Sequence, residues 1–159
     1  MKPGGTKMEP GDAKPQARIL IVEDVANVAT VLQARLESYN YQVCDIVQSG
    51  PQAIASAMAN KPDLVLMDIL LDGDMNGIEA AEQISRQMDV PIIFLSCLND
   101  QQVLENAIQT KPYGFILKPY DNAELKFNIE NALNRYKDNK AQARLLDKLK
   151  KEQIPGQPE

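Results

Sequence analysis

The stretch KPDLVLMDILLDGD, residues 61–74, places a carboxylate directly after a run of apolar side chains. Residues 64–67 (LVLM) have the composition of a buried β-strand, and Asp68 follows them at once. Two more carboxylates, Asp72 and Asp74, lie in the loop beyond. A carboxylate at the end of a buried strand is costly unless it has a partner or a task. The segments on either side of this stretch indicate which of the two applies.

Strand-like and helix-like segments alternate along the chain. The strand-like segments are short and apolar and cover residues 18–22, 41–47, 64–68, 90–96 and 114–117. Apolar residues recur at helical spacing in residues 25–36 (Val25, Val28, Ala29, Leu32 and Leu36), 51–60, 77–87 and 99–110. A last, long helix begins near Asp121, a good N-cap. These five βα units predict an α/β fold with a doubly wound, five-stranded parallel sheet.

Composition narrows the class of protein. A chain of 159 residues is about one domain, and 44% apolar with 25% charged residues is ordinary for a soluble globular protein. The net charge of −5 argues against a nucleic-acid surface. No apolar run approaches the roughly 20 residues of a membrane span, and the N-terminus lacks the apolar core of a secretory signal. We therefore expect a cytoplasmic protein with no membrane or nucleic-acid partner.

The sequence contains no histidine, which removes several kinds of site. Histidine-ligated metals, Ser-His-Asp and Cys-His nucleophiles and a phosphohistidine donor are all excluded. The two cysteines, Cys44 and Cys97, lie in apolar runs, and we expect buried, reduced thiols. Any chemistry must come from carboxylates, lysine, hydroxyls and the backbone.

The two ends of the chain differ from the middle. Residues 1–16 are rich in proline and glycine, and we expect a disordered tail there and in the last five residues, PGQPE. We expect one domain over residues 17–136 and a helical extension and tail over residues 137–159. The extension carries Leu145, Leu146 and Leu149 among lysines. We interpret it as a dimerising or partner-docking helix, with a solvated helical end as the alternative.

Polar residues follow four of the predicted strands. Glu23 and Asp24 follow the first, Asp68 ends the third, Ser96 ends the fourth and Lys118 follows the fifth. The carboxyl ends of parallel strands meet at one edge of a sheet, where functional groups gather. Three carboxylates repel one another unless a cation lies among them, and oxygen ligands suit Mg²⁺ or Mn²⁺. With the metal and lysine balancing charge, Asp68 could attack a phosphoryl group and form an acyl phosphate.

The motifs IVEDV, LVLMDILL, FLSCL and GFILKPY, in this order, resemble the receiver domain of two-component response regulators. The resemblance covers about residues 18–136 and implies the flavodoxin-like or CheY-like (βα)5 fold with an extended C-terminal helix. It implies that Asp68 accepts phosphate from a sensor histidine kinase or a phosphotransfer protein. It also implies that Mg²⁺, for which Mn²⁺ could substitute, is held by Glu23, Asp24, Asp68 and the backbone carbonyl of Leu70.

The same resemblance assigns the remaining site residues. Ser96 is the hydroxyl that reports phosphorylation, Lys118 contacts the phosphoryl group, and Pro119 follows it through a cis peptide bond. Phe115 is the aromatic switch. The output is a contact with a downstream protein, made by the face of helix 99–110, strand 114–117 and the last helix. Tyr113 and Tyr120 flank this face as candidate contact residues, and a homodimer through this face or the C-terminal helix stays open.

Some positions depart from the common pattern. The loop after Asp68 is one residue longer and lacks the usual proline. Leu70 and Leu98 occupy positions where family members place side chains that influence the water attacking the acyl phosphate. Neither leucine activates water, so we predict slow self-dephosphorylation. Asp72 and Asp74 either add charge around the metal site or are solvated turn residues.

Other functions fit parts of the pattern. A receiver of this kind is either a terminal switch or a relay intermediate that passes phosphate to another histidine, and a phosphorylation-independent scaffold is a further alternative. A flavodoxin-like binding module is disfavoured because Glu23 and Asp24 would repel a cofactor phosphate. A phosphohydrolase is disfavoured because Leu70 stands where a general acid is expected. We therefore predict no enzymatic turnover. No further domain fits after residue 136, so we expect a stand-alone receiver.

Overall fold

The structure is a computed structural model in which residues 14–97 and 100–153 are described. Disorder of residues 1–13 and of the last five residues, and the tuning role of Leu98, are predictions that lie outside the described residues. Among the helices of the described ranges, none has both the length and the apolar character that a membrane crossing requires.

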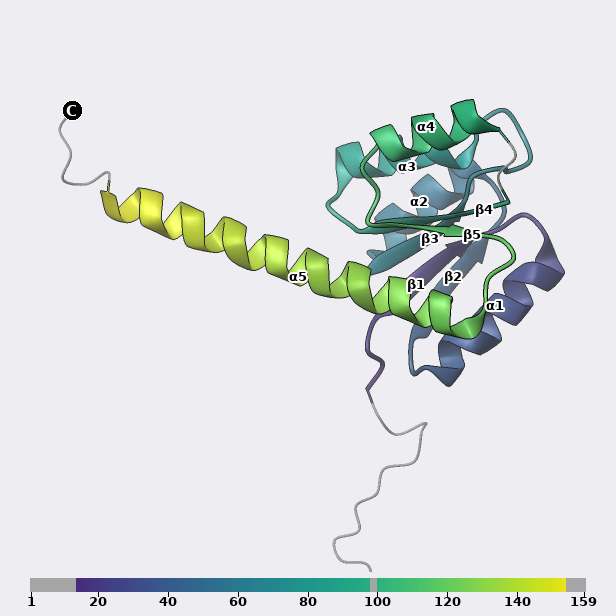
Figure 1. The fold of residues 1–159 in the computed structure, drawn as a ribbon, viewed down its shortest axis with the longest axis horizontal. Coiled ribbons are helices and arrows are strands. Elements are labelled where there is room, and N and C mark those ends of the chain that lie inside the picture. Colours follow the sequence, from purple (N-terminus) through teal and green to yellow (C-terminus); the bar gives the residue numbers. More distant parts are fainter. Residues whose placement is uncertain (1–13, 98–99, 154–159) are drawn as a thin grey trace, which may run out of the picture.

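Five strands alternate with five helices in the described part of the chain (Figure 1). The strands are β1 Arg18–Val22, β2 Gln42–Val47, β3 Leu64–Asp68, β4 Ile92–Ser96 and β5 Gly114–Leu117. The helices are α1 Ala26–Ser38, α2 Gly50–Asn60, α3 Gly77–Gln87, α4 Gln101–Gln109 and α5 Asn122–Gln153. The predicted alternation is confirmed, with bounds close to the expected ones.

All neighbouring strands pair in parallel, in the order β2-β1-β3-β4-β5. Helices α1 and α5 cover one face of this sheet, and α2, α3 and α4 cover the other (Figure 1). This is the predicted doubly wound sheet. The strands β1, β3, β4 and β5 are neighbours, and β2 lies at the edge.

Apart from Arg18, Asp68 and Ser96 at their ends, the central strands β1, β3 and β4 are apolar, because both of their faces are buried. In β1, Ile19 and Ile21 pack with the α1 and α5 layer, while Leu20 and Val22 pack with the α2 and α3 layer. Each such fully buried side chain contributes about 1.5–3 kcal/mol of transfer free energy. The sheet therefore holds the residues at the carboxyl ends of its strands in fixed positions.

Side-chain caps fix where several helices begin. Asn76 and Glu79 form a reciprocal capping box at the start of α3. The predicted cap of α5 is confirmed: the Glu124 N–H donates to Asp121 Oδ1 at 2.8 Å, and the Asp121 N–H donates to Glu124 Oε1 at 3.2 Å. These caps position the loops that carry the polar residues after the strands.

Some residues expected in the interior are exposed. Val25 and Val28 are 51% and 37% exposed, because Val25 precedes the first turn of α1 and Val28 lies beside the inward-facing Ala29 on the outer side of the helix. Cys97 is exposed because it comes just after the end of β4, and Cys44 on the edge strand is partly buried. The expectation of two buried thiols was wrong for Cys97.

Candidate functional site

The sheet brings the polar residues that follow four strands to one edge. Glu23 and Asp68 are 1% and 7% exposed, and Ser96 is 1% exposed, so all three are buried. Asp24 and Lys118 are partly buried beside them. The strand order explains this convergence, because β3 lies between β1 and β4, and β5 follows β4.

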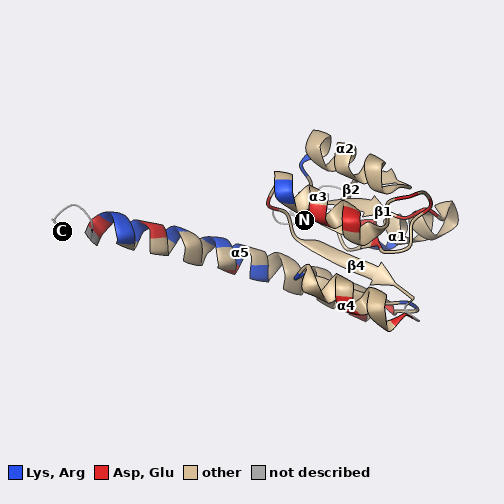
Figure 2. Ribbon diagram, turned by 90° about the horizontal axis from the view of Figure 1, so that it is seen from above, with Lys and Arg blue, Asp and Glu red and all other residues tan. Residues whose placement is uncertain are grey.

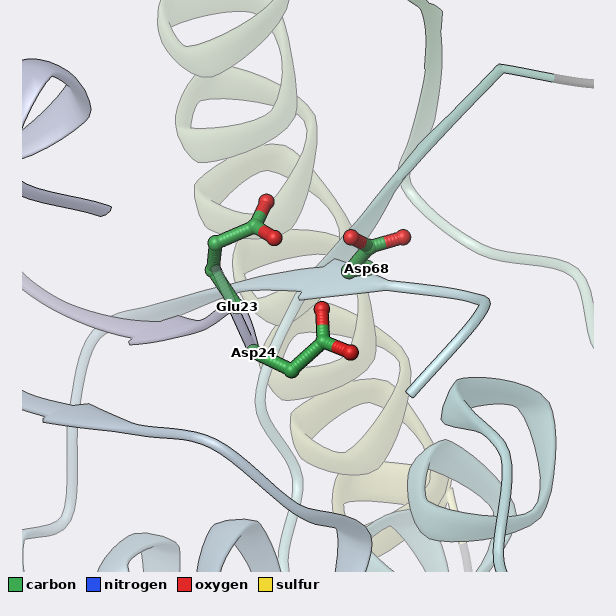
Figure 3. A group of neighbouring side chains, drawn as sticks. All are labelled: Glu23, Asp24 and Asp68. Atoms are coloured by element: carbon green, nitrogen blue, oxygen red, sulfur yellow. The ribbon is translucent and has the colours of Figure 1, made fainter. Parts of the chain in front are cut away.

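Three carboxylates face one another at this edge (Figure 3). Glu23, Asp24 and Asp68 each offer an oxygen atom within 4.8 Å of the other two. Backbone groups orient two of them: the Val25 N–H donates to Glu23 Oε2 at 3.2 Å, and the Leu70 N–H donates to Asp68 Oδ1 at 3.2 Å. A set of hard oxygen donors such as this one fits Mg²⁺ or Mn²⁺.

Lys118 bridges two of the three carboxylates. Its Nζ lies 3.1 Å from Glu23 Oε1 and 3.2 Å from Asp68 Oδ2. Burial alone would lower the pKa of Lys118, but the Asp68 and Glu23 carboxylates outweigh it, and the pKa is raised above its ordinary value. The ammonium is therefore charged at every physiological pH, and it offsets part of the carboxylate repulsion.

Ser96 and Phe115 lie on the other side of Asp68. The Ser96 hydroxyl is buried and has no hydrogen-bond partner among the described residues. A buried hydroxyl without a partner is costly, and this one is available for a group that arrives at the site. Phe115 is partly buried and meets the Phe94 ring edge-on at 6.3 Å between centroids. The peptide bond between Lys118 and Pro119 is cis.

Of the two loop carboxylates, Asp72 is the one that reaches the site. Burial raises the pKa of Asp24, and charge repulsion from the neighbouring Asp72 carboxylate raises it further. Asp74 instead lines a shallow groove with Glu79 and Arg86 of α3. Leu70 is 57% exposed, so its side chain is available to solvent next to Asp68.

Gly77 is a site residue that the sequence analysis missed. A β-carbon at this position would collide with the backbone carbonyl of Asp68, and the Gly77 N–H donates to the Ile69 carbonyl at 2.8 Å. The glycine thus lets the start of α3 lie directly against the end of β3. The available signal was the Asn-Gly pair before a helical pattern, but only the path of the loop reveals the close approach.

The two candidate contact tyrosines lie at opposite ends of β5. Tyr120 is partly buried near the site, with the Arg35 guanidinium 5.9 Å from its ring centroid. Tyr113 lies at the other end, where its carbonyl accepts from Arg135 Nη1 at 2.9 Å and its hydroxyl accepts from Asn139 Nδ2 at 3.0 Å. Tyr113 therefore connects β5 to α5, away from the carboxylates.

Comparisons with known proteins agree with this geometry. The model of the response regulator receiver domain matches residues 19–130. PdtaR, a transcriptional regulatory protein of Mycobacterium tuberculosis, is 30% identical over 127 residues, which cover 80% of this chain and 62% of PdtaR. The response regulator ArlR of Staphylococcus saprophyticus is 35% identical over 118 residues, which cover 74% of this chain and 53% of ArlR. This chain spans little more than half the length of these relatives.

A solved structure has the same fold. The signal receiver domain of a modulated diguanylate cyclase from Desulfovibrio desulfuricans G20 superposes with a TM-score of 0.74 at 32% identity. The match covers 77% of this chain and 98% of that one.

Proposed function

This chain belongs to the response regulator receiver domain family, and we propose that it acts as a switch controlled by phosphorylation of Asp68. The observation that carries the proposal is the cluster at the edge of the sheet. The Asp68 carboxylate meets two other carboxylates and the Lys118 ammonium, next to the buried Ser96 hydroxyl that has no partner among the described residues.

The proposed reaction is phosphoryl transfer from a phosphohistidine of a sensor kinase or phosphotransfer protein. The chain has no histidine, so the donor belongs to the partner. An Asp68 oxygen forms a bond to phosphorus as the phosphorus–nitrogen bond breaks, and the electron pair returns to the imidazole nitrogen. Lys118 stabilises the negative charge on the transferring oxygens. The buried β3 strand fixes Asp68 at its end, and this would limit the loss of orientational freedom in an in-line attack.

We propose that Glu23, Asp24, Asp68 and the backbone carbonyl of Leu70 hold Mg²⁺, with Mn²⁺ as a substitute. The ion would neutralise charge on the phosphoryl oxygens. The three buried or partly buried carboxylates support this assignment, because Lys118 alone cannot balance them. Asp72 would strengthen the local negative potential without being a ligand.

The proposed switch is a population shift between two arrangements of Ser96 and Phe115. Phosphoryl oxygens would attract the Ser96 hydroxyl, and Phe115 would turn into the space that it leaves. The α4–β5–α5 face would then bind a downstream protein. Each of the three elements contributes an exposed apolar side chain, which supports a binding role for this face. These are Ile108, Leu117 and Phe127, which are 56%, 53% and 66% exposed.

Two other functions found among receiver domains are alternative proposals for this chain. A relay intermediate would pass the phosphoryl group from Asp68 to another histidine, and a scaffold would act without phosphate. We propose no enzymatic turnover, because the position two residues after Asp68 is the apolar Leu70. The intact set of site residues favours the switch over the scaffold.

Phosphoramidate tests the proposal, because its phosphorus–nitrogen bond resembles that of phosphohistidine. The protein is incubated with phosphoramidate and Mg²⁺, the acyl phosphate is reduced with borohydride, and peptide masses locate the modified residue. Modification of Asp68 supports the switch, and its loss on adding a histidine phosphotransfer protein would favour the relay. Modification at another residue, or none in the presence of bound Mg²⁺, would contradict both.

A further inference from the structure

Helix α5 continues well beyond its last contacts with the domain (Figure 1). These contacts are made by Asn139, which donates to the Tyr113 hydroxyl, and by Lys140, whose Nζ lies 2.7 Å from Asp89 Oδ2. All residues from 141 to 152 are exposed. At 1.5 Å per residue this segment projects about 20 Å from the domain.

The projecting segment carries a cluster of exposed leucines. Leu145, Leu146 and Leu149 are 57%, 59% and 44% exposed. Among the described residues, no other element packs against this end of the 32-residue helix α5. Leucines that are surrounded by charged residues on such a helix indicate a surface that a partner covers.

Most basic residues of the same segment lie away from the leucines, whereas Lys150 lies four positions after Leu146 and borders them. Arg144, Lys148 and Lys151 each lie two positions after a member of the row Gln142, Leu146 and Leu149. Residues two apart on a helix do not share a face. Lys137 and Lys140 extend the basic row toward the domain, and the blue parts of the ribbon in Figure 2 show that Lys and Arg recur along α5, with acidic residues between them.

This separation of charge and leucine selects among possible partners. An anionic membrane would bury the leucines and attract the lysines to its head groups, but Asp147 interrupts the basic row and pairs with Lys151 at 3.2 Å, which weakens that attraction. A second copy of the same helix covers the leucine face and leaves Arg144, Lys148 and Lys151 pointing outward. Lys150 then lies at the edge of the contact, a position where lysine is common in paired helices. The spacing of Gln142, Leu146, Leu149 and Gln153, at four, three and four residues, also suits a helix–helix seam.

We propose that residues 142–153 of two copies pair through Leu146 and Leu149, with Leu145 at the edge of the seam. The pairing is independent of phosphorylation, because none of these residues contacts the carboxylate site. The seam holds few leucines and lies well below the standard size of a stable interface. The dimer is therefore weak, and its population depends on protein concentration.

Sedimentation velocity of the full chain tests the pairing, over ~1 to ~500 µM protein without a phosphoryl donor. A reducing agent is present because Cys97 is exposed. The wild type should shift from monomer to dimer within this range. Leu146→Gln with Leu149→Gln should weaken the dimer at least ~10-fold. Lys148→Gln with Lys151→Gln, the matched control on the opposite face, should leave it unchanged or tighter.

Three results would overturn the proposal. The first is a wild type that stays monomeric at the highest concentration. The second is a dimer that the leucine variant retains but that Phe127→Gln abolishes, because the contact would then be the α4–β5–α5 face. The third is binding to anionic phosphatidylserine vesicles that the lysine pair controls, with no self-association.

Discussion

The two ends of β5 differ in how their polar groups are satisfied. At the carboxyl end, Lys118 meets carboxylates that outnumber it, and the nearby Ser96 hydroxyl has no partner among the described residues. At the amino end, Tyr113 has its carbonyl and hydroxyl bonded to α5, and its ring meets the Arg135 guanidinium at 5.2 Å. The carboxylates and the Ser96 hydroxyl at the carboxyl end are therefore available to bind a ligand. The second end has its polar groups paired, and it serves stability.

This difference predicts which substitutions should affect phosphorylation and which should affect only the stability of the fold. Substitutions at the carboxyl end should change phosphorylation by large factors. Substitutions at the amino end should lower the free energy of unfolding and leave phosphorylation intact.

The largest expected effect comes from Lys118→Ala. The variant removes the ammonium that lies 3.2 Å from Asp68 and that would balance the transferring phosphoryl oxygens. We expect the phosphorylation rate with acetyl phosphate to fall ~10²-fold or more, as for the loss of one donor that stabilises a transition state. Intact mass over time measures the rate, and Lys118→Arg, which keeps the charge, should lose less. An unchanged rate in Lys118→Ala would remove Lys118 from the mechanism.

A smaller effect is expected at Leu70 and Leu98, the two positions at which the sequence predicts an influence on the water that attacks the acyl phosphate. Asparagine at both Leu70 and Leu98 should shorten the lifetime of the acyl phosphate by ~10-fold, because a polar side chain can orient the attacking water. Leu70 is exposed, so its substitution does not disturb the core. The decay of the phosphorylated mass after donor removal gives the lifetime. An unaltered lifetime would contradict the prediction of slow self-dephosphorylation.

Arg135→Ala tests the amino end of β5. It removes the hydrogen bond to the Tyr113 carbonyl and the contact with its ring, and we expect a loss of about 1 kcal/mol in the free energy of unfolding. Urea unfolding measures this loss. Arg144→Ala, on the exposed part of the same helix, is the control and should change little. If Arg135→Ala also slowed phosphorylation strongly, the two ends of β5 would be coupled.

The smallest effect is expected at Tyr41. Its hydroxyl is buried without a partner among the described residues, and burial raises its pKa to about 12, with a contribution from Glu130. The neutral form is favoured in the fold, so this stabilisation is present below the ordinary pKa and is lost as pH rises toward about 12. Tyr41→Phe should be neutral or stabilising by up to ~1 kcal/mol at pH 7.

Unfolding curves at pH 7 and at alkaline pH measure the Tyr41 effect. The wild type should lose more stability than Tyr41→Phe between the two conditions. Equal losses in both proteins would show that the Tyr41 hydroxyl does not govern this part of the pH dependence.

The fold and the centre of the site followed from sequence patterns because each rests on local information. Apolar runs alternating with helical spacing predicted the sheet, and parallel strands place their carboxyl ends together. That rule placed Glu23, Asp24, Asp68 and Lys118 at one edge before any contact was known.

The remaining features depend on how loops and distant segments run in space. The sequence pattern did not predict that Asp72 lies near Asp24, whereas Asp74 lines a groove beside α3. It did not reveal that Gly77 touches the end of β3. The bond between Tyr113 and Asn139 joins residues 26 positions apart, which no short motif encodes.

Intact mass after incubation with acetyl phosphate is the most direct test of the central claim, that the clustered strand ends make Asp68 a phosphoryl acceptor. Wild type and Asp68→Asn are compared, each with Mg²⁺ and with a chelator. We expect one phosphate adduct in the wild type with Mg²⁺ and none in the other three samples. An adduct on Asp68→Asn, or one that forms equally well with the chelator, would contradict the claim.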